Sequence, residues 1–163
     1  MSAADRGSGP IPAAVARRSS SSARPHRPVR LPDPPLVDER AGIVLRPWAA
    51  TPGDVAALVA AWSDPLLAAA DGTPDEISTA RAARWIRGDA RRRAMGACLD
   101  LVICPAGAGG TEVRRGAGGS VLGEVGLRNI DLERRRAEIS WWLAPEHRGR
   151  GIAAAAARVL ADW

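Results

Sequence analysis

The residues best suited to chemistry lie in a short arginine- and glycine-rich segment near the C-terminus. This segment reads Pro145-Glu-His-Arg-Gly-Arg-Gly-Ile-Ala153, and the residues that follow it favour helix. A loop that enters a helix can direct successive backbone N–H groups toward one point, where the helix's positive end binds a pyrophosphate without a metal. Gly149 and Gly151 would let phosphate approach the main chain closely. Arg148 and Arg150 would offset the charge of the anion.

Two carboxylates on neighbouring predicted strands are candidates for proton transfer. If side chains alternate, Glu138 and Trp142 share one face of the strand at 137–143, and Glu138 is the first candidate for a general base. Glu124 on the preceding strand is the second candidate. The alternative for either residue is a strand-surface carboxylate paired with one of the many arginines. His147 lies on the phosphate side of the loop and is a weaker catalytic candidate.

The elements that must position these residues are indicated by hydrophobic spacing and helix caps. Apolar, extended runs predict four strands, over residues 42–48, 98–104, 120–130 and 137–143. Capped, periodic segments predict helices over residues 51–62 and 78–93, with a third after residue 153. The arginines of the second helix are expected mostly to face water, and the glycine-rich stretch 105–119 is expected to be a surface loop. The predicted order β-α-α-β-β-β-α indicates an α/β (α+β) fold, with a mixed, mainly antiparallel sheet flanked by helices.

Composition divides the chain into a tail and one domain. Residues 1–41, rich in Ser, Pro, Ala and Arg, are expected to be disordered, and residues 42–163 to form the domain. The tail holds seven Arg and four acidic residues, so it carries +3 of the total net charge of +5. The remaining +2 is nearly balanced, which gives little weight to nucleic-acid binding.

The sequence also indicates a location and a redox state. No apolar run approaches the ~20 residues that cross a bilayer, and the N-terminus lacks a secretory core, so we expect a cytoplasmic protein. Cys98 and Cys104 would lie roughly 20 Å apart on one strand, and we expect two reduced thiols with neither a disulfide nor a metal site.

The loop near the C-terminus carries a family resemblance. Arg148-Gly-Arg-Gly-Ile-Ala153 is similar to Arg/Gln-x-x-Gly-x-Gly/Ala, the acetyl-CoA signature of the GCN5-related N-acetyltransferases, abbreviated GNAT. The wider stretch 137–153 resembles the strand-to-helix passage of the branch that acetylates ribosomal-protein N-termini. Leu45-Arg-Pro-Trp48 resembles the opening strand of that branch, and the resemblance covers about residues 42–163.

This resemblance implies transfer of an acetyl group from acetyl-CoA to a primary amine, by direct attack of the neutral amine on the thioester. The acceptor would be a ribosomal-protein or peptide N-terminus, or a small-molecule amine. No metal and no membrane are expected. The main chain of the fourth strand would pair with the pantetheine amides, and the loop would hold the pyrophosphate. The residues implied in cofactor binding are Trp142, Leu143, Arg148, Gly149, Arg150, Gly151, Ile152 and Ala153.

This chain departs from the family pattern in that it stops at Trp163. Members of the family continue with a fifth strand, a fourth helix and usually two more strands, so we expect a C-terminally truncated chain with weak or no activity by itself. Without a fifth strand, the fourth would expose unpaired N–H and C=O groups beside Trp141 or Trp142, which predicts self-association through the sheet edge.

Three other functions fit parts of the sequence. The chain could be a non-catalytic acetyl-CoA-binding fragment. Gly149-Arg-Gly-Ile-Ala-Ala154 also satisfies Gly-x-Gly-x-x-Ala, but a Rossmann site needs these glycines directly after a parallel strand and an acidic residue ~20 positions later. An arginine-rich nucleic-acid-binding module is less favoured, because no base-reading motif or interleaved aromatic pattern accompanies the arginines.

Overall fold

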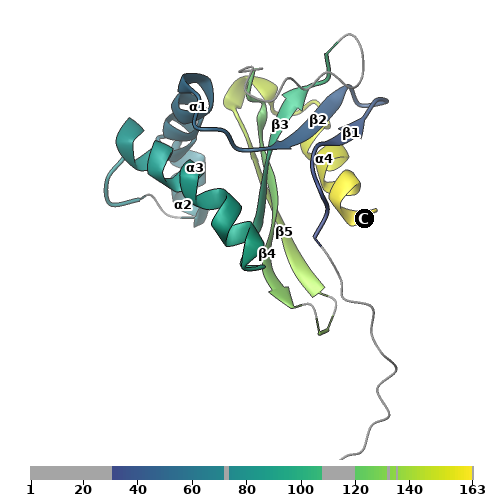
Figure 1. Ribbon diagram of the computed structural model, residues 1–163. Helices are drawn as coiled ribbons and strands as arrows, with labels where there is room; N and C mark the ends of the chain where they lie inside the picture. Colours follow the sequence, from purple (N-terminus) through teal and green to yellow (C-terminus); the bar gives the residue numbers. More distant parts are fainter. Residues whose placement is uncertain (1–30, 72–73, 108–119, 132, 135, 163) are drawn as a thin grey trace, which may run out of the picture.

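A computed structural model describes residues 31–71, 74–107, 120–131, 133–134 and 136–162 (Figure 1). Its strands are β1 (Leu36–Asp38), β2 (Ile43–Pro47), β3 (Leu99–Pro105), β4 (Gly123–Asp131) and β5 (Arg136–Leu143). Its helices are α1 (Pro52–Trp62), α2 (Pro65–Asp71), α3 (Thr79–Ala94), the short 3₁₀ helix η1 (Pro145–His147) and α4 (Ile152–Ala161). Most of the predicted tail and of the predicted loop at 105–119 lies outside the described residues.

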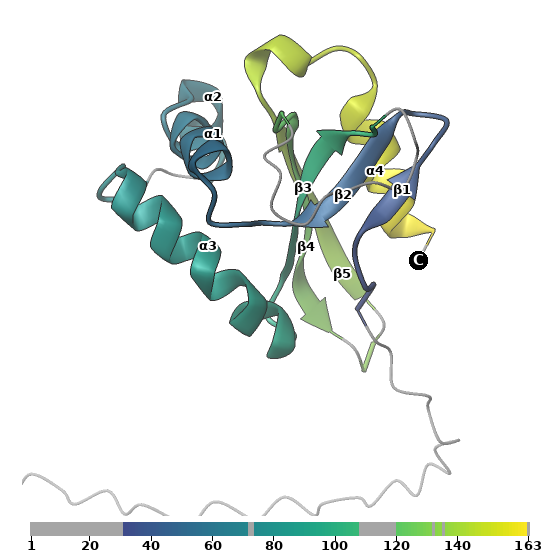
Figure 2. The ribbon, with the colours of Figure 1, turned by 45° about the horizontal axis from the view of Figure 1, so that its top comes forward.

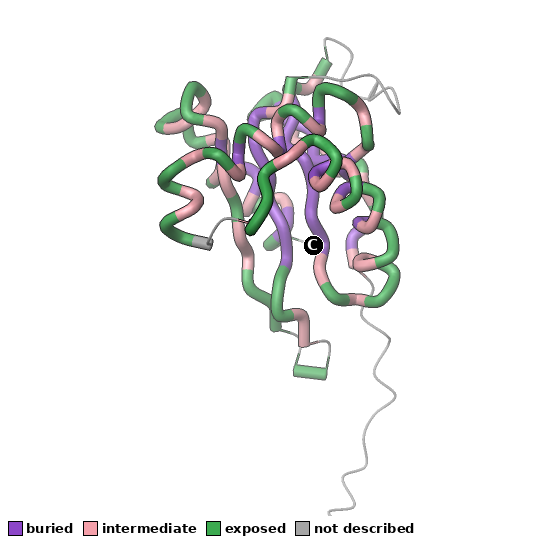
Figure 3. Tube along the Cα trace, turned by 90° about the vertical axis from the view of Figure 1, so that its left-hand side faces the viewer, coloured by how far each residue is buried: buried purple, intermediate pink, exposed green. Residues whose placement is uncertain are grey.

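The strands form one antiparallel sheet in the order β1-β2-β3-β4-β5. The helices α1, α2 and α3 lie on one side of this sheet, and α4 lies on the other (Figure 2). Because both faces of the central strand β3 are covered, six of its seven residues are buried, and the buried positions gather in the sheet (Figure 3). The predicted fold class, a mainly antiparallel sheet flanked by helices, is confirmed.

Two apolar clusters pack on the two faces of the sheet. The cluster under α4 includes Ile43, Leu45, Leu99, Leu101, Ile103, Val125, Leu127, Leu143, Ala155, Ala156 and Leu160. The cluster under α1 and α3 is smaller and consists of Trp48, Leu58, Ala82, Ile86, Val102 and Cys104. Successive residues of β3 alternate between the two clusters, as the two-residue period of a strand requires. The sheet therefore supports a separate packed layer on each side.

A buried ion pair fixes α1 against the sheet. Thr51 caps the helix by accepting a hydrogen bond from the N–H of Asp54 at 3.2 Å. The Asp54 carboxylate in turn accepts two hydrogen bonds of 2.7 Å from the guanidinium of Arg46 on β2. It also accepts the N–H of Ala49 at 2.9 Å. Since this bidentate pair and the main-chain bond share one buried carboxylate, the start of α1 has a fixed position on the sheet.

Three short elements, β1, α2 and η1, were missed by the sequence prediction. Ordered structure was expected to begin at residue 42, but β1 precedes it and pairs with β2, with Leu36 opposite Leu45. Three residues are too few to show a periodicity, and β1 is defined by its partner strand. Helix α1 ends at Trp62, before the Asp64–Pro65 step, but a further helix that the sequence did not predict begins at this step. Asp64 accepts the N–H of Leu66 at 2.8 Å and so caps this helix, α2, which has proline in its first position.

The arginines of α3 are not all directed to water. Arg84, Arg87 and Arg91 are exposed, as predicted. Arg92 instead lies over the ring of Trp85, with its guanidinium carbon 4.1 Å from the ring centroid, and donates a hydrogen bond to the Trp85 carbonyl at 2.9 Å. Within the part of the chain described above, no helix has both the length and the apolar character that spanning a bilayer requires.

Candidate active site

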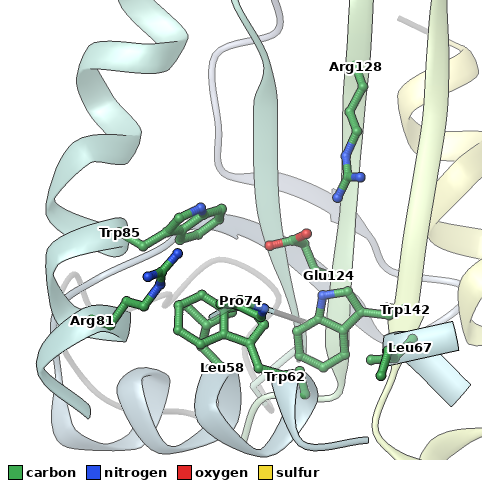
Figure 4. A pocket seen from close by; sticks show the side chains of 11 residues that line it. Leu58, Trp62, Leu67, Pro74, Arg81, Trp85, Glu124, Arg128 and Trp142 are labelled. Carbon is green, nitrogen blue, oxygen red and sulfur yellow. The ribbon is translucent and has the colours of Figure 1, made fainter. Parts of the chain in front are cut away.

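A pocket opens between the helices α1, α2 and α3 and the face of β4 and β5 that these helices cover (Figure 4). It encloses about 420 Å³, which lies in the range of small-ligand sites. Its floor is set by the strand register, in which Glu124 of β4 lies directly opposite Trp142 of β5. The residues that line it are Leu58, Ala61, Trp62, Leu67, Ala68, Pro74, Arg81, Trp85, Glu124, Arg128 and Trp142.

Glu124 is the buried acid of this pocket. Its side chain is 4% exposed, and one carboxylate oxygen accepts a hydrogen bond of 2.6 Å from the indole N–H of Trp48. Burial raises the pKa of Glu124 to about 8, and the charge of Asp100 adds to this effect. The Trp48 hydrogen bond and the positive charge of Arg128 act in the opposite direction. A carboxyl group that gains and loses a proton near neutral pH is suited to acid–base chemistry.

Tryptophan rings hold this carboxylate in place. Trp48 packs edge-on against Trp85, with ring centroids 6.1 Å apart, and stacks with Trp142 at 6.4 Å. Trp62, Trp85 and Trp142 also line the pocket, and their rings surround the space that Glu124 enters (Figure 4). The Trp48 indole is therefore packed on two sides while it donates its hydrogen bond to Glu124.

By the register of β4 and β5, Glu138 lies on the same face of the sheet as Glu124, but it does not line the pocket. It is exposed and accepts a hydrogen bond from the side-chain amide of Asn129 at 2.8 Å. In the register, Glu138 opposes Arg128, which is four residues from Glu124 and thus roughly 13 Å along β4. Of the two carboxylates singled out in the sequence, only Glu124 is in the pocket.

The loop at residues 148–153 leads into α4 through two glycines with left-handed backbone conformations. Gly149 has φ of 72° and Gly151, the N-cap of α4, has φ of 75°. No atom beyond the two flanking residues lies within 4 Å of where a Cβ would project from either glycine, so both border open space. No described residue accepts a hydrogen bond from the N–H groups of residues 149–153. Together with the positive end of α4, these groups form an arrangement that fits a pyrophosphate.

The arginines of the loop have different surroundings. Arg150 is exposed. Arg148 donates a hydrogen bond to the carbonyl of Leu143 at 3.0 Å and forms an ion pair with Asp64, at the start of α2. The N–H of Leu66 and the Arg148 guanidinium lower the pKa of Asp64. The side chain of Arg148 thus fastens the loop to β5 and α2.

Trp142, Leu143 and His147, which the sequence singled out, lie in β5 and η1, just before the loop. Among the described strands, β5 pairs only with β4, and Trp141 beside its outer edge is 56% exposed. Because the N–H of Ala144 bonds to Leu122 of the β4 side, strand alternation directs the main chain of Trp142 toward β4 and that of Leu143 outward. His147 is in η1, with its Nε2 3.8 Å from Glu146, and it does not line the pocket.

Sequence reasoning missed most of the pocket wall. Trp62, Trp85 and Arg81 line the pocket and Trp48 donates to Glu124, but all four were assigned to elements without a role in a site. One signal was present, because the chain has six tryptophans and neither tyrosine nor phenylalanine. A large aromatic residue retained in such a composition is a candidate for a contact that aliphatic side chains cannot make.

Known proteins share this sequence pattern and fold. A family model of the acetyltransferase (GNAT) domain matches residues 43–163. YdaF of Bacillus subtilis (strain 168), named as a ribosomal N-acetyltransferase, is 44% identical over 45 residues, which make up 28% of this chain and 25% of YdaF.

Solved structures agree on the fold. One named as a ribosomal-protein-serine acetyltransferase from Vibrio cholerae is 15% identical, with a TM-score of 0.58 over 80% of this chain and 66% of that one. RimL, a ribosomal L7/L12 α-N-protein acetyltransferase in complex with coenzyme A, is 16% identical, with a TM-score of 0.55 over 78% and 66%. The chain spans about two thirds of these structures and a quarter of YdaF. With its family match over most of its length and this shared fold, the chain belongs to the acetyltransferase (GNAT) domain family.

Proposed function

We propose that this protein is an acetyl-CoA-dependent N-acetyltransferase that acts on a primary amine. The observation that carries the proposal is the buried carboxyl group of Glu124, which has a pKa of about 8 inside a tryptophan-lined pocket. Its strand, β4, pairs with β5, and β5 leads through η1 into the loop at 148–153. The proposed proton acceptor on β4 and the proposed anion-binding loop after β5 are therefore joined by one continuous stretch of chain.

The loop at 148–153 would hold the pyrophosphate of acetyl-CoA. The main-chain N–H groups of residues 149–153 have no acceptor among the described residues, and both glycines of the loop border open space. Bound acetyl-CoA supplies the activated acetyl group as a thioester. The outward main-chain N–H of Leu143 is the proposed contact for the pantetheine portion, because the main chain of Trp142 is directed toward β4 and the Leu143 carbonyl is engaged by Arg148.

Glu124 would accept the proton that an ammonium group must lose before its nitrogen can attack a carbonyl carbon. The tryptophan rings would exclude water from that nitrogen and keep the carboxylate oriented through the Trp48 indole. The exposure of Glu138 and its bond to Asn129 support a surface role for that residue. We therefore assign the general base to Glu124.

The proposed acceptor is a protein or peptide N-terminus. The names of YdaF and of both solved relatives refer to ribosomal proteins, which supports this class over small-molecule amines. We also propose self-association through the outer edge of β5, where Trp141 is 56% exposed. Sedimentation of the protein over a concentration series, compared with Trp141→Glu, would test the association.

The proposed function is tested by release of free thiol from acetyl-CoA in the presence of peptide amines. We expect Glu124→Gln to reduce the rate about 10²- to 10⁴-fold, because general base catalysis contributes that much. Glu138→Gln is the matched control and is expected to change the rate by less than about threefold, since mutation of an exposed carboxylate has small effects.

A calorimetric titration with acetyl-CoA separates catalysis from binding. Both variants should bind acetyl-CoA as the unaltered chain does, because neither carboxylate belongs to the loop. Binding of acetyl-CoA without thiol release for any amine would favour a non-catalytic acetyl-CoA-binding protein. Equal loss of rate in the two variants would exclude Glu124 as the specific base.

A further inference from the structure

The pocket around Glu124 presents opposite charges from two walls. Glu124 enters it from β4, and Arg81 enters it from α3 on the other side (Figure 4). Arg128, on the same strand as Glu124, also lines the pocket and acts electrostatically on that carboxyl group. The lining therefore contains two guanidinium groups and one carboxyl group, a positive excess that persists whether Glu124 is ionised or not.

The charge of Arg81 does not stabilise its own helix, α3. It lies in the first turn of α3, where its N–H bonds to the cap residue Ser78, and where the positive end of the helix disfavours a cation. That first turn contains no acidic residue. Among the residues that the structure describes, no carboxylate forms an ion pair with the Arg81 side chain. Its guanidinium is thus available to a ligand in the pocket.

The aromatic walls fit the part of a ligand that lies between these charges. Trp62, Trp85 and Trp142 offer flat apolar surfaces, and their π faces also attract an ammonium group. A volume of about 420 Å³ accommodates a ligand the size of one or two amino-acid residues. A short molecule could therefore reach Glu124 and Arg81 at once.

We infer that the acceptor is a zwitterion, a primary amine that carries a carboxylate or phosphate group a few bonds away. The amine lies at Glu124, the anionic group pairs with Arg81, and the intervening atoms pack on the tryptophans. This inference rests on the proposed function, because it takes Glu124 as the position of the reacting amine. Two sources share this chemistry: a peptide N-terminus followed by an acidic residue, and a small amino acid.

The inference is tested by equilibrium binding to the full-length chain, followed by its tryptophan fluorescence. The probes are the C-terminally amidated peptides Ala-Glu-Gly and Ala-Gln-Gly, which differ by one charge, and 4-aminobutyrate against its neutral amide. We expect the charged member of the favoured pair to bind about tenfold more tightly, as a charge-assisted hydrogen bond provides. Selectivity within the peptide pair or within the small-molecule pair identifies the source of the acceptor.

Arg81→Ala should remove that tenfold preference, and Arg81→Gln is a second variant of similar size. The matched control is Arg84→Ala, on the same helix but exposed, which should retain the preference. Equal binding of charged and neutral probes to the unaltered chain would overturn the inference, as would absence of binding by all four. A preference that survives in Arg81→Gln would overturn it as well.

Thiol release measured with the same probes keeps this inference apart from the proposed function. Charge-selective binding that depends on Arg81 but yields no acetyl transfer would refute the catalytic function and leave the zwitterion site in place. Equal acetyl transfer to charged and neutral acceptors, unchanged in Arg81→Gln, would support the function and refute the charge selection.

Discussion

The loop at residues 148–153 and the pocket around Glu124 are built from different parts of the chain. The loop offers main-chain N–H groups, and its glycines are required by their positive φ angles. The pocket offers side chains from α1, α2, α3, β4 and β5, including a carboxyl group with a shifted pKa. A site made of backbone depends on the conformation of a few neighbouring residues. A site made of side chains depends on how distant elements pack.

The sharpest way to break this comparison is to change the backbone of the loop. Gly151→Val is expected to weaken acetyl-CoA binding about ten- to hundredfold, because a left-handed conformation costs a non-glycine residue about 1–3 kcal/mol. Calorimetric titration measures the affinity. Gly42→Val is the matched control, since Gly42 also has positive φ and open space around it but lies in the β1–β2 turn. Equal loss of affinity in both variants would contradict a local role for the loop.

A change in the pocket should leave the cofactor affinity intact and alter the pH dependence instead. The rate should rise with pH and level off above about 8, because Glu124 accepts a proton only when ionised. Trp48 lowers the pKa of Glu124, so Trp48→Phe should move the pH–rate profile to higher pH and reduce the rate at pH 7 about five- to tenfold.

The control for this variant is Trp62→Phe, which alters a ring of the pocket wall without removing the hydrogen bond from Trp48 to Glu124. Its profile should keep the midpoint of the unaltered protein. If both variants share one midpoint, the Trp48 indole does not set the protonation of the base.

The smallest effect on acetyl-CoA affinity is expected from removing a side chain of the loop. Arg150 is exposed and contributes a side chain to a loop that we propose to bind acetyl-CoA through its main chain. Arg150→Ala should therefore weaken acetyl-CoA binding only about twofold, and the difference should shrink as salt is raised. The measurement is a titration at two ionic strengths. A loss as large as that of Gly151→Val would mean that arginine charge, rather than the backbone, carries the binding.

The same contrast explains how far the sequence could be interpreted. The fold class and most elements follow from periodicity and caps, as for α1 with Thr51 at its cap and Asp54 in its first turn. The loop was predictable because Gly149 and Gly151 act within one short segment. The short strand β1 was not, because its formation depends on pairing with β2.

The pocket could not be assembled from the sequence for a similar reason. Alternation put Glu138 and Trp142 on one face, but it is the register of β4 and β5 that adds Glu124 to that face, and periodicity does not say which carboxylate lies under a helix. Glu124 is distinguished from Glu138 by its hydrogen bond from the indole of Trp48, which is 76 residues away in the chain. Pairings across such distances are set by tertiary packing.

Arg148 bridges the two regions, since its guanidinium contacts both the end of β5 and Asp64 at the start of α2. Two residues of α2, Leu67 and Ala68, belong to the wall that faces Glu124. If binding of a ligand at the loop changes these Arg148 contacts, it also changes the free energy of binding a ligand in the pocket around Glu124. Thermodynamic linkage makes that influence mutual. The factor by which bound acetyl-CoA would change the affinity for the amine equals the factor by which bound amine would change the affinity for acetyl-CoA.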